Sequence, residues 1–136
     1  PELAELPGVH ALTDVTGFGL AGHLLEIARG ANLTAHIQWA DVPLLPNVSG
    51  LLKDGHVTGA SGRNWEGYGQ EINLAKDLPA ECQALLSDPQ TSGGLMVSCA
   101  PDSVADVLAV FQRHGFSEAA VVGHMGQVQS SRLMVS

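Results

Sequence analysis

The chain has 136 residues, of which 45% are hydrophobic, and this size and composition are sufficient for one compact core. Six Lys and Arg residues stand against fourteen Asp and Glu residues, and the net charge of −8 disfavours nucleic acid and anionic membranes as partners. No apolar run approaches the roughly 20 residues that span a bilayer, so we expect a soluble, cytoplasmic protein without membrane contact.

The N-terminal third contains two strand patterns and one helix pattern. Residues 1–8 begin with Pro and resemble a linker or the end of a preceding helix, so we expect one domain over 9–136 that belongs to a longer protein. Residues 9–15 are β-prone. Apolar residues at helical spacing from Leu20 predict a helix that Gly30 ends. Alternating side chains over 33–39 predict a second strand.

The remainder of the chain alternates helices and strands. We expect a short helix from Pro46 that Gly55 ends, and a glycine-rich loop with one or two short helical turns over 56–77. The further predicted elements are a short helix over 79–88, a strand over 95–99, a helix over 101–114, and strands over 119–125 and 132–136. This order predicts an α+β or α/β fold with a mixed sheet of about four strands flanked by helices.

Cys82 and Cys99 are the two cysteines of the chain, and neither lies in a C-x-x-C pair. We expect two reduced thiols of a cytosolic protein rather than a disulfide or a zinc site. Neither cysteine has the sequence context of a catalytic nucleophile.

The segment 17–22 has the spacing G-x-G-x-x-G, which is typical of a loop that binds a dinucleotide pyrophosphate, and Asp41 follows at about the expected distance. Three features oppose this interpretation. Four residues separate the strand core from Gly17, the chain is too short for a doubly wound sheet, and Asp14 would place a carboxylate beside the phosphates without a nearby Lys or Arg.

A divalent cation between Asp14 and a phosphate group removes this electrostatic conflict. Mg²⁺ takes one or two carboxylates and completes its octahedron with water and phosphate oxygens. Thr13 and Thr16 then offer hydroxyl groups, and the backbone amides of Gly17 and Gly19 face the phosphate at the start of a helix. The alternative is that Asp14 and Thr16 only cap that helix.

A second cluster, S-D-P-Q-T-S-G-G-L over 87–95, is typical of a tight turn before a strand. Asp88 and the hydroxyls of Thr91 and Ser92 leave open a role beside phosphate or at a domain interface. Of the six histidines only His23 lies near a candidate site, and we expect it to be solvated on a helix face. The segment Arg63–Trp65 receives no role from its sequence.

T-D-V-T-G-F-G over 13–19 and S-D-P-Q-T-S-G-G-L over 87–95, in this order and at this separation, closely resemble the C-terminal domain of selenophosphate synthetase (selenide, water dikinase). The resemblance covers nearly the whole chain. Either motif alone indicates the wider superfamily, which includes aminoimidazole ribonucleotide synthetase, thiamine-monophosphate kinase and a hydrogenase-maturation protein.

This resemblance implies a mixed-sheet domain of an enzyme that converts ATP, selenide and water to selenophosphate, AMP and phosphate. It implies that Asp14 is a Mg²⁺ ligand presented to the interdomain site, with Thr13, Thr16, Gly17 and Gly19 as its supporting loop. The catalytic Cys or selenocysteine, the Lys, most of the ATP site and the homodimer contact belong to an N-terminal domain. The chain alone is therefore expected to be inactive. The alternatives are a non-catalytic packing domain and the same domain of another ATP-using superfamily member.

Overall fold

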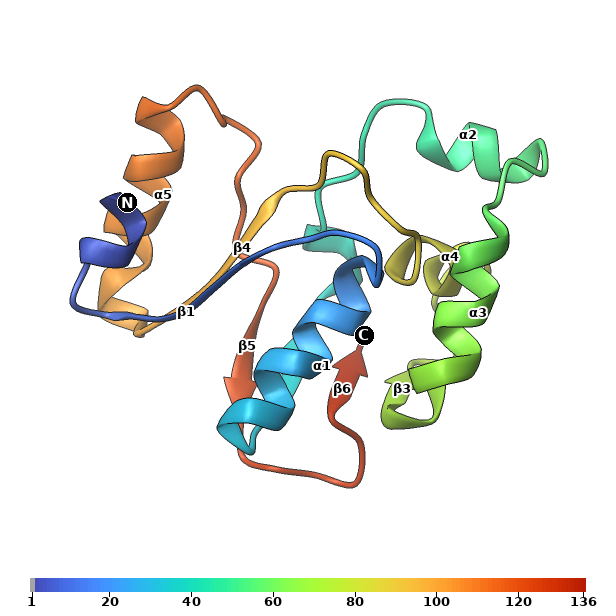
Figure 1. Ribbon diagram of the computed structural model, residues 1–136, viewed down its shortest axis with the longest axis horizontal. Helices are drawn as coiled ribbons and strands as arrows, with labels where there is room; N and C mark the ends of the chain where they lie inside the picture. The colour runs from blue at the N-terminus through green and yellow to red at the C-terminus, as the bar shows by residue number, and fades with distance from the viewer. Residues whose placement is uncertain (1) are drawn as a thin grey trace.

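The computed structural model describes residues 2–136 and contains two sheets with helices around them (Figure 1). The larger sheet has the strand order β3-β6-β2-β5. Its strands are β2 (Thr34–Ile37), β3 (Ile72–Leu74), β5 (Gly123–Gly126) and β6 (Leu133–Val135). Since β6 is parallel to β2 and β3 while β5 is antiparallel to β2, this is the predicted mixed four-stranded sheet.

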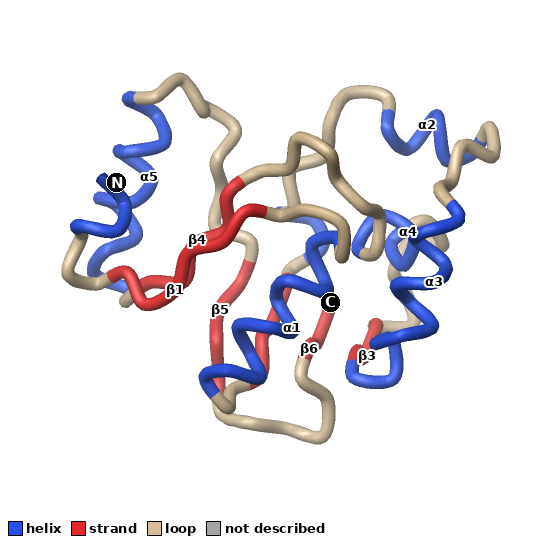
Figure 2. The backbone as a smooth tube through the Cα atoms, viewed as in Figure 1, coloured by secondary structure: helices blue, strands red, loops and turns tan. Residues whose placement is uncertain are grey.

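The second sheet is an antiparallel ribbon of two strands, β1 (Val9–Asp14) and β4 (Leu95–Cys99). Figure 2 shows these two strands side by side, outside the larger sheet. The predicted strand over 9–15 is therefore confirmed, but it pairs across more than 80 residues of sequence with β4. This pairing brings the end of β1 beside the turn that precedes β4.

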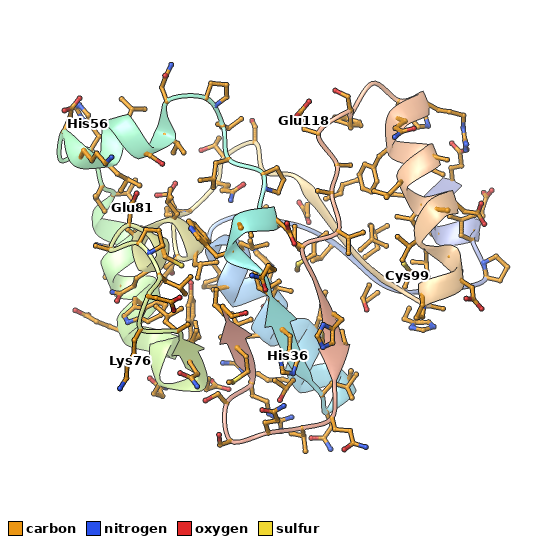
Figure 3. The ribbon with its side chains drawn as sticks, turned by 180° about the vertical axis from the view of Figure 1, so that it is seen from behind. His36, His56, Lys76, Glu81, Cys99 and Glu118 are labelled. Atoms are coloured by element: carbon orange, nitrogen blue, oxygen red, sulfur yellow. The ribbon has the colours of Figure 1, made fainter. Side chains whose placement is uncertain are left out.

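Helix α1 (Gly19–Ala31) covers one face of the larger sheet and supplies four of the eleven buried residues of the main core. Leu25 and Ala28 are fully buried there, as is Leu133 of β6. Figure 3, which views the molecule from behind, shows His36 on the opposite face of the sheet, where its ring stacks on that of His124 at 4.7 Å. The predicted stop at Gly30 is wrong, because the helix continues to a left-handed Asn32 with φ 52°.

Helices α3 (Gly59–Tyr68) and α4 (Cys82–Leu86) lie beside the larger sheet, and α2 (Val48–Lys53), which buries no residue, lies farther out (Figure 1). The short 3-10 helices η2 (Trp39–Asp41) and η3 (Gly69–Glu71) complete this part of the chain. The prediction over 56–77 was a loop with one or two short helical turns, and the segment instead forms the ten-residue helix α3 and the strand β3. Its glycines lower helix propensity, but α3 is stabilised by burial of Ser61 and Tyr68 against its neighbours.

A second, smaller core lies at the other end of the ribbon. Helix α5 (Val104–Arg113), preceded by η4 (Pro101–Ser103), packs Val107 and Val110 against Leu3 of the 3-10 helix η1 (Glu2–Glu5). The ribbon thus connects two separate hydrophobic clusters. Within residues 2–136, no helix has the length and apolar character needed to cross a membrane.

Candidate functional site

The two sequence motifs meet in space at the end of the ribbon that lies near α1. We call residues 13–19 the site loop and residues 87–94 the second loop. Asp14 at the end of β1 pairs with Leu95 at the start of β4. Beyond this pair, the Val15 N–H donates to the Gly94 carbonyl at 2.9 Å, and the Gln90 N–H donates to the Thr16 carbonyl at 3.0 Å. Two motifs about 75 residues apart in sequence therefore form one structural unit.

Two glycines make this close approach possible. A Cβ atom on Gly93 would lie 1.8 Å from the Val15 carbonyl oxygen, which is less than any real contact. Gly19 has φ +70°, and a Cβ atom there would lie 2.8 Å from the Leu86 carbonyl oxygen. Both positions need glycine because the site loop and the second loop are in direct backbone contact.

His23 holds the site loop from the second turn of α1. Its side chain is buried, with 7% exposure, so the expectation of a solvated helix-face histidine is wrong. Nε2 lies 3.1 Å from both the backbone nitrogen and the hydroxyl oxygen of Thr16, and Nδ1 lies 3.0 Å from Glu26 Oε2. The Thr16 N–H requires Nε2 to be an acceptor, so the neutral ring carries its proton on Nδ1 and donates it to Glu26.

This Thr-His-Glu arrangement has the spacing of a nucleophile with a base, but its hydrogen bonds indicate a different role. An unprotonated imidazole nitrogen has one lone pair, and the Thr16 N–H and hydroxyl both point to it. The histidine therefore fixes the loop. Sequence reasoning missed this contact because Thr16 and His23 belong to different local structures.

Helix α3 holds the same two loops from the other side. The Asn64 side-chain amide donates to the carbonyls of Gly17 and Ser87, and the Tyr68 hydroxyl donates to the Phe18 carbonyl at 2.6 Å. Burial raises the pKa of Tyr68 to about 12, against a smaller opposing effect of the Gly22 backbone. The hydroxyl therefore remains a donor throughout the physiological range.

Asp14 does not cap α1. The alternative that Asp14 and Thr16 serve only as caps of this helix is therefore excluded. The N-cap residue is Phe18, and no side chain accepts from the first turn. The Thr16 hydroxyl bonds His23 instead, and the Thr13 hydroxyl donates to the Asp14 carbonyl at 3.1 Å. Within residues 2–136 the exposed Asp14 carboxylate has neither a hydrogen bond nor an ion pair.

The N–H groups of Gly17 and Gly19 differ in whether they are free to donate a hydrogen bond to an anion. The Gly19 N–H donates to the Thr16 carbonyl at 3.0 Å and is thus already engaged. Gly17 is exposed, and the space over its Cα is open. An approaching anion would therefore meet the Gly17 amide first.

The side chains near Asp14 could supply one ligand of a Mg²⁺ ion but not a complete set of ligands. Across the described part of the chain, no three His, Cys, Asp or Glu side chains gather as a metal-binding group. One carboxylate with no competing cation is a suitable single ligand, since Mg²⁺ commonly takes one or two carboxylates with water and phosphate oxygens. Cys82 is no candidate ligand at neutral pH, because burial and then the Glu81 charge raise its pKa to about 11.

The fold and the paired loops define a family. The sequence profile described as "AIR synthase related protein, C-terminal domain" matches residues 1–136, and the chain belongs to this family. Within it, the chain matches the C-terminal domain of selenophosphate synthetases. It is 64% identical over 124 residues to the selenide, water dikinase of Burkholderia ambifaria and 53% identical over 127 residues to that of Dechloromonas aromatica.

These alignments cover 91% and 93% of this chain but only 35% and 36% of the two relatives, so the chain spans about a third of their length. Among solved structures, E. coli HypE, a hydrogenase maturation protein, matches with a TM-score of 0.65 at 22% identity over 97% of this chain and 34% of HypE. Thiamine-monophosphate kinase from Stenotrophomonas maltophilia matches with a TM-score of 0.56 at 17% identity, over 95% of this chain and 32% of the kinase. These two structures support the fold.

Proposed function

We propose that this chain is the C-terminal domain of an ATP-dependent enzyme that makes selenophosphate from selenide, ATP and water, with AMP and phosphate as the other products. Its partner is the enzyme's own N-terminal domain, which supplies the catalytic Cys or selenocysteine, the Lys and most of the ATP site. The complete enzyme is a cytoplasmic homodimer. This domain closes the site from one side and contributes Asp14 to a Mg²⁺ ion.

The observation that supports the proposal most directly is that the Asp14 carboxylate is exposed and unpaired in the described chain. This carboxylate stands at the end of a strand, exposed and without a partner in the described chain, while the backbone on either side is held by hydrogen bonds. A carboxylate fixed in this way repels phosphate unless a cation lies between them. The electrostatics of the loop therefore support a metal-bridged polyphosphate rather than a directly bound one.

Mg²⁺ bound there would neutralise charge on the phosphate oxygens during phosphoryl transfer. Asp14 holds the cation, and the site loop fixes the backbone from which its carboxylate projects. The exposed Gly17 amide offers a hydrogen bond to a phosphate oxygen. Thr13, Thr16 and Gly19 maintain the loop through the contacts described above. The chain supplies no nucleophile.

The test is Asp14→Asn in a full-length family enzyme that carries this domain, with selenide-dependent AMP formation measured against Mg²⁺ concentration. We expect a loss of turnover of about 100-fold or more, because the charge of a metal ligand is removed while its shape is kept. Asp77→Asn, in an exposed turn, is the matched control and should leave turnover unchanged.

Unchanged turnover in a folded Asp14→Asn enzyme would reduce this domain to a packing module. A second measurement concerns the chain alone, which should form no AMP from ATP and selenide. Activity of the isolated chain would show that the assignment of the chemistry to the N-terminal domain is wrong.

A further inference from the structure

The segment Arg63–Trp65, which has no recognisable motif, contains the residue that joins the two loops. We propose that Asn64 is a positioning residue that holds the backbone from which the Asp14 carboxylate projects, by fixing the site loop on the second loop. This inference rests on the proposed metal role of Asp14. It adds a residue from α3, an element that contains neither motif.

The Asn64 amide nitrogen carries two hydrogens, and both are used. One goes to the Gly17 carbonyl at 2.9 Å and the other to the Ser87 carbonyl at 3.0 Å. Because both partners are carbonyl oxygens, the amide orientation is unambiguous, since the flipped side chain would place its oxygen against two acceptors. One side chain therefore connects the middle of the site loop to the first residue of the second loop.

The position of Asn64 on α3 explains why it can make this bridge. Ser61, Asn64 and Tyr68 lie on one helix face at i, i+3 and i+7. Ser61 donates to the Ala84 carbonyl at 2.8 Å, and Tyr68 donates to the Phe18 carbonyl at 2.6 Å. Ser61 anchors one end of this face to α4, and Tyr68 anchors the other end to the start of α1. Asn64 lies between these two anchors, and its position relative to the two loops is therefore fixed.

The bridge acts on the segment immediately after the carboxylate. Only Val15 and Thr16 separate Asp14 from Gly17, and both have backbone contacts with the second loop. Gly17 lies within the turn closed by the Gly19 N–H to Thr16 carbonyl bond, and its own carbonyl accepts the Asn64 amide at 2.9 Å. Loss of the bridge removes the side-chain link between this turn and the second loop. Groups that orient a metal ligand typically change metal affinity by 10–100-fold when they are removed.

The test compares Asn64→Leu and Asn64→Gln in the full-length enzyme, with Asn73→Leu on the remote strand β3 as the matched control. The first readout is the dissociation constant of Mn²⁺ in the presence of ATP, from the electron paramagnetic resonance signal of free Mn²⁺. The second is the Mg²⁺ concentration for half-maximal turnover. We expect Asn64→Leu to raise both by about tenfold, Asn64→Gln to raise them by less because its amide is kept, and Asn73→Leu to change neither.

The melting temperature separates positioning from plain stabilisation. If Asn64→Leu lowers the melting temperature but leaves the Mn²⁺ constant unchanged, the proposal is overturned. If that variant does not fold, Asn64→Ala, which removes the amide without adding apolar bulk, decides, and an unchanged Mn²⁺ constant in the folded Ala variant overturns the proposal as well. Asp14→Asn is measured in parallel. A normal metal dependence in that variant refutes the proposed function itself, whereas a defect confined to Asp14→Asn refutes only the role of Asn64.

Discussion

Gly93 and Gly94 are adjacent in the second loop, yet an added methyl group has different consequences at the two positions. At Gly93 it would overlap the Val15 carbonyl, whereas at Gly94 it meets nothing within 4 Å. We therefore expect Gly93→Ala to lower the free energy of unfolding by about 3 kcal/mol, because the two loops must separate. Gly94→Ala should stay within about 0.5 kcal/mol of the parent chain. Urea unfolding of both variants measures the difference, and equal midpoints would contradict the loop contact.

At the same scale, sequence reasoning identified the motif residues but not what they touch. The electrostatic conflict at Asp14 was visible in the sequence, because a carboxylate beside a G-x-G-x-x-G loop would repel phosphate unless a cation lay between them. The burial of His23 and the bridge made by Asn64 were not visible. Both depend on contacts between elements, and a histidine on an amphipathic helix looks the same in sequence whether its face meets solvent or a loop.

Among the elements, α3 depends on its N-cap more than the other helices do. Its ten residues include three glycines, and the Thr58 side chain accepts the Ser61 N–H at 3.2 Å. Thr58→Ala should lower the free energy of unfolding by about 1 kcal/mol. The control is Ser130→Ala at an exposed position, which should have almost no effect. A Thr58→Ala variant as stable as the control in thermal melts would show that the cap contributes nothing.

The same helix shows where prediction of elements from sequence fails. Helices α1 and α5 were predictable, because an apolar stripe at helical spacing needs no knowledge of the partner. Helix α3 has no such stripe, and the face that contacts its neighbours is made of Ser61, Asn64 and Tyr68, whose role appears only beside α4 and the site loop. Strand β3 has three residues and is recognisable only by its pairing with β6.

At the scale of the whole molecule, the Tyr68 hydroxyl and the Cys82 thiol make the free energy of unfolding depend on pH in the alkaline range. Burial raises the pKa of Tyr68 to about 12 from 10.0, and that of Cys82 to about 11 from 9.0. The folded state thus keeps protons that the unfolded chain releases. This stabilisation is fully present below pH 9 and is lost as the pH rises through 11 and 12, with a slope of up to about 1.4 kcal/mol per pH unit for each group.

Urea midpoints measured from pH 8 to pH 12 test this linkage. Tyr68→Phe should flatten the decline above pH 10, because the titrating group is gone, although the variant is less stable at every pH without its hydrogen bond to Phe18. Cys82→Ala should flatten the decline between pH 9 and pH 11. A parent chain whose stability is constant across this range would show that the burial of these groups is incomplete in solution.

The strand pairing also has a consequence for the order in which the domain can form on the ribosome. Strand β1 pairs with β4, and β2 pairs with β5 and β6, so no strand of the first 40 residues has a partner within that segment. During synthesis both early strands leave the exit tunnel with unpaired edges. Strand β1 can pair only after β4 has been made, and β2 only after β5 and β6 have been made. The backbone that carries Asp14 therefore reaches its paired arrangement only after β4 has been synthesised, which places completion of the proposed metal site in the later part of folding.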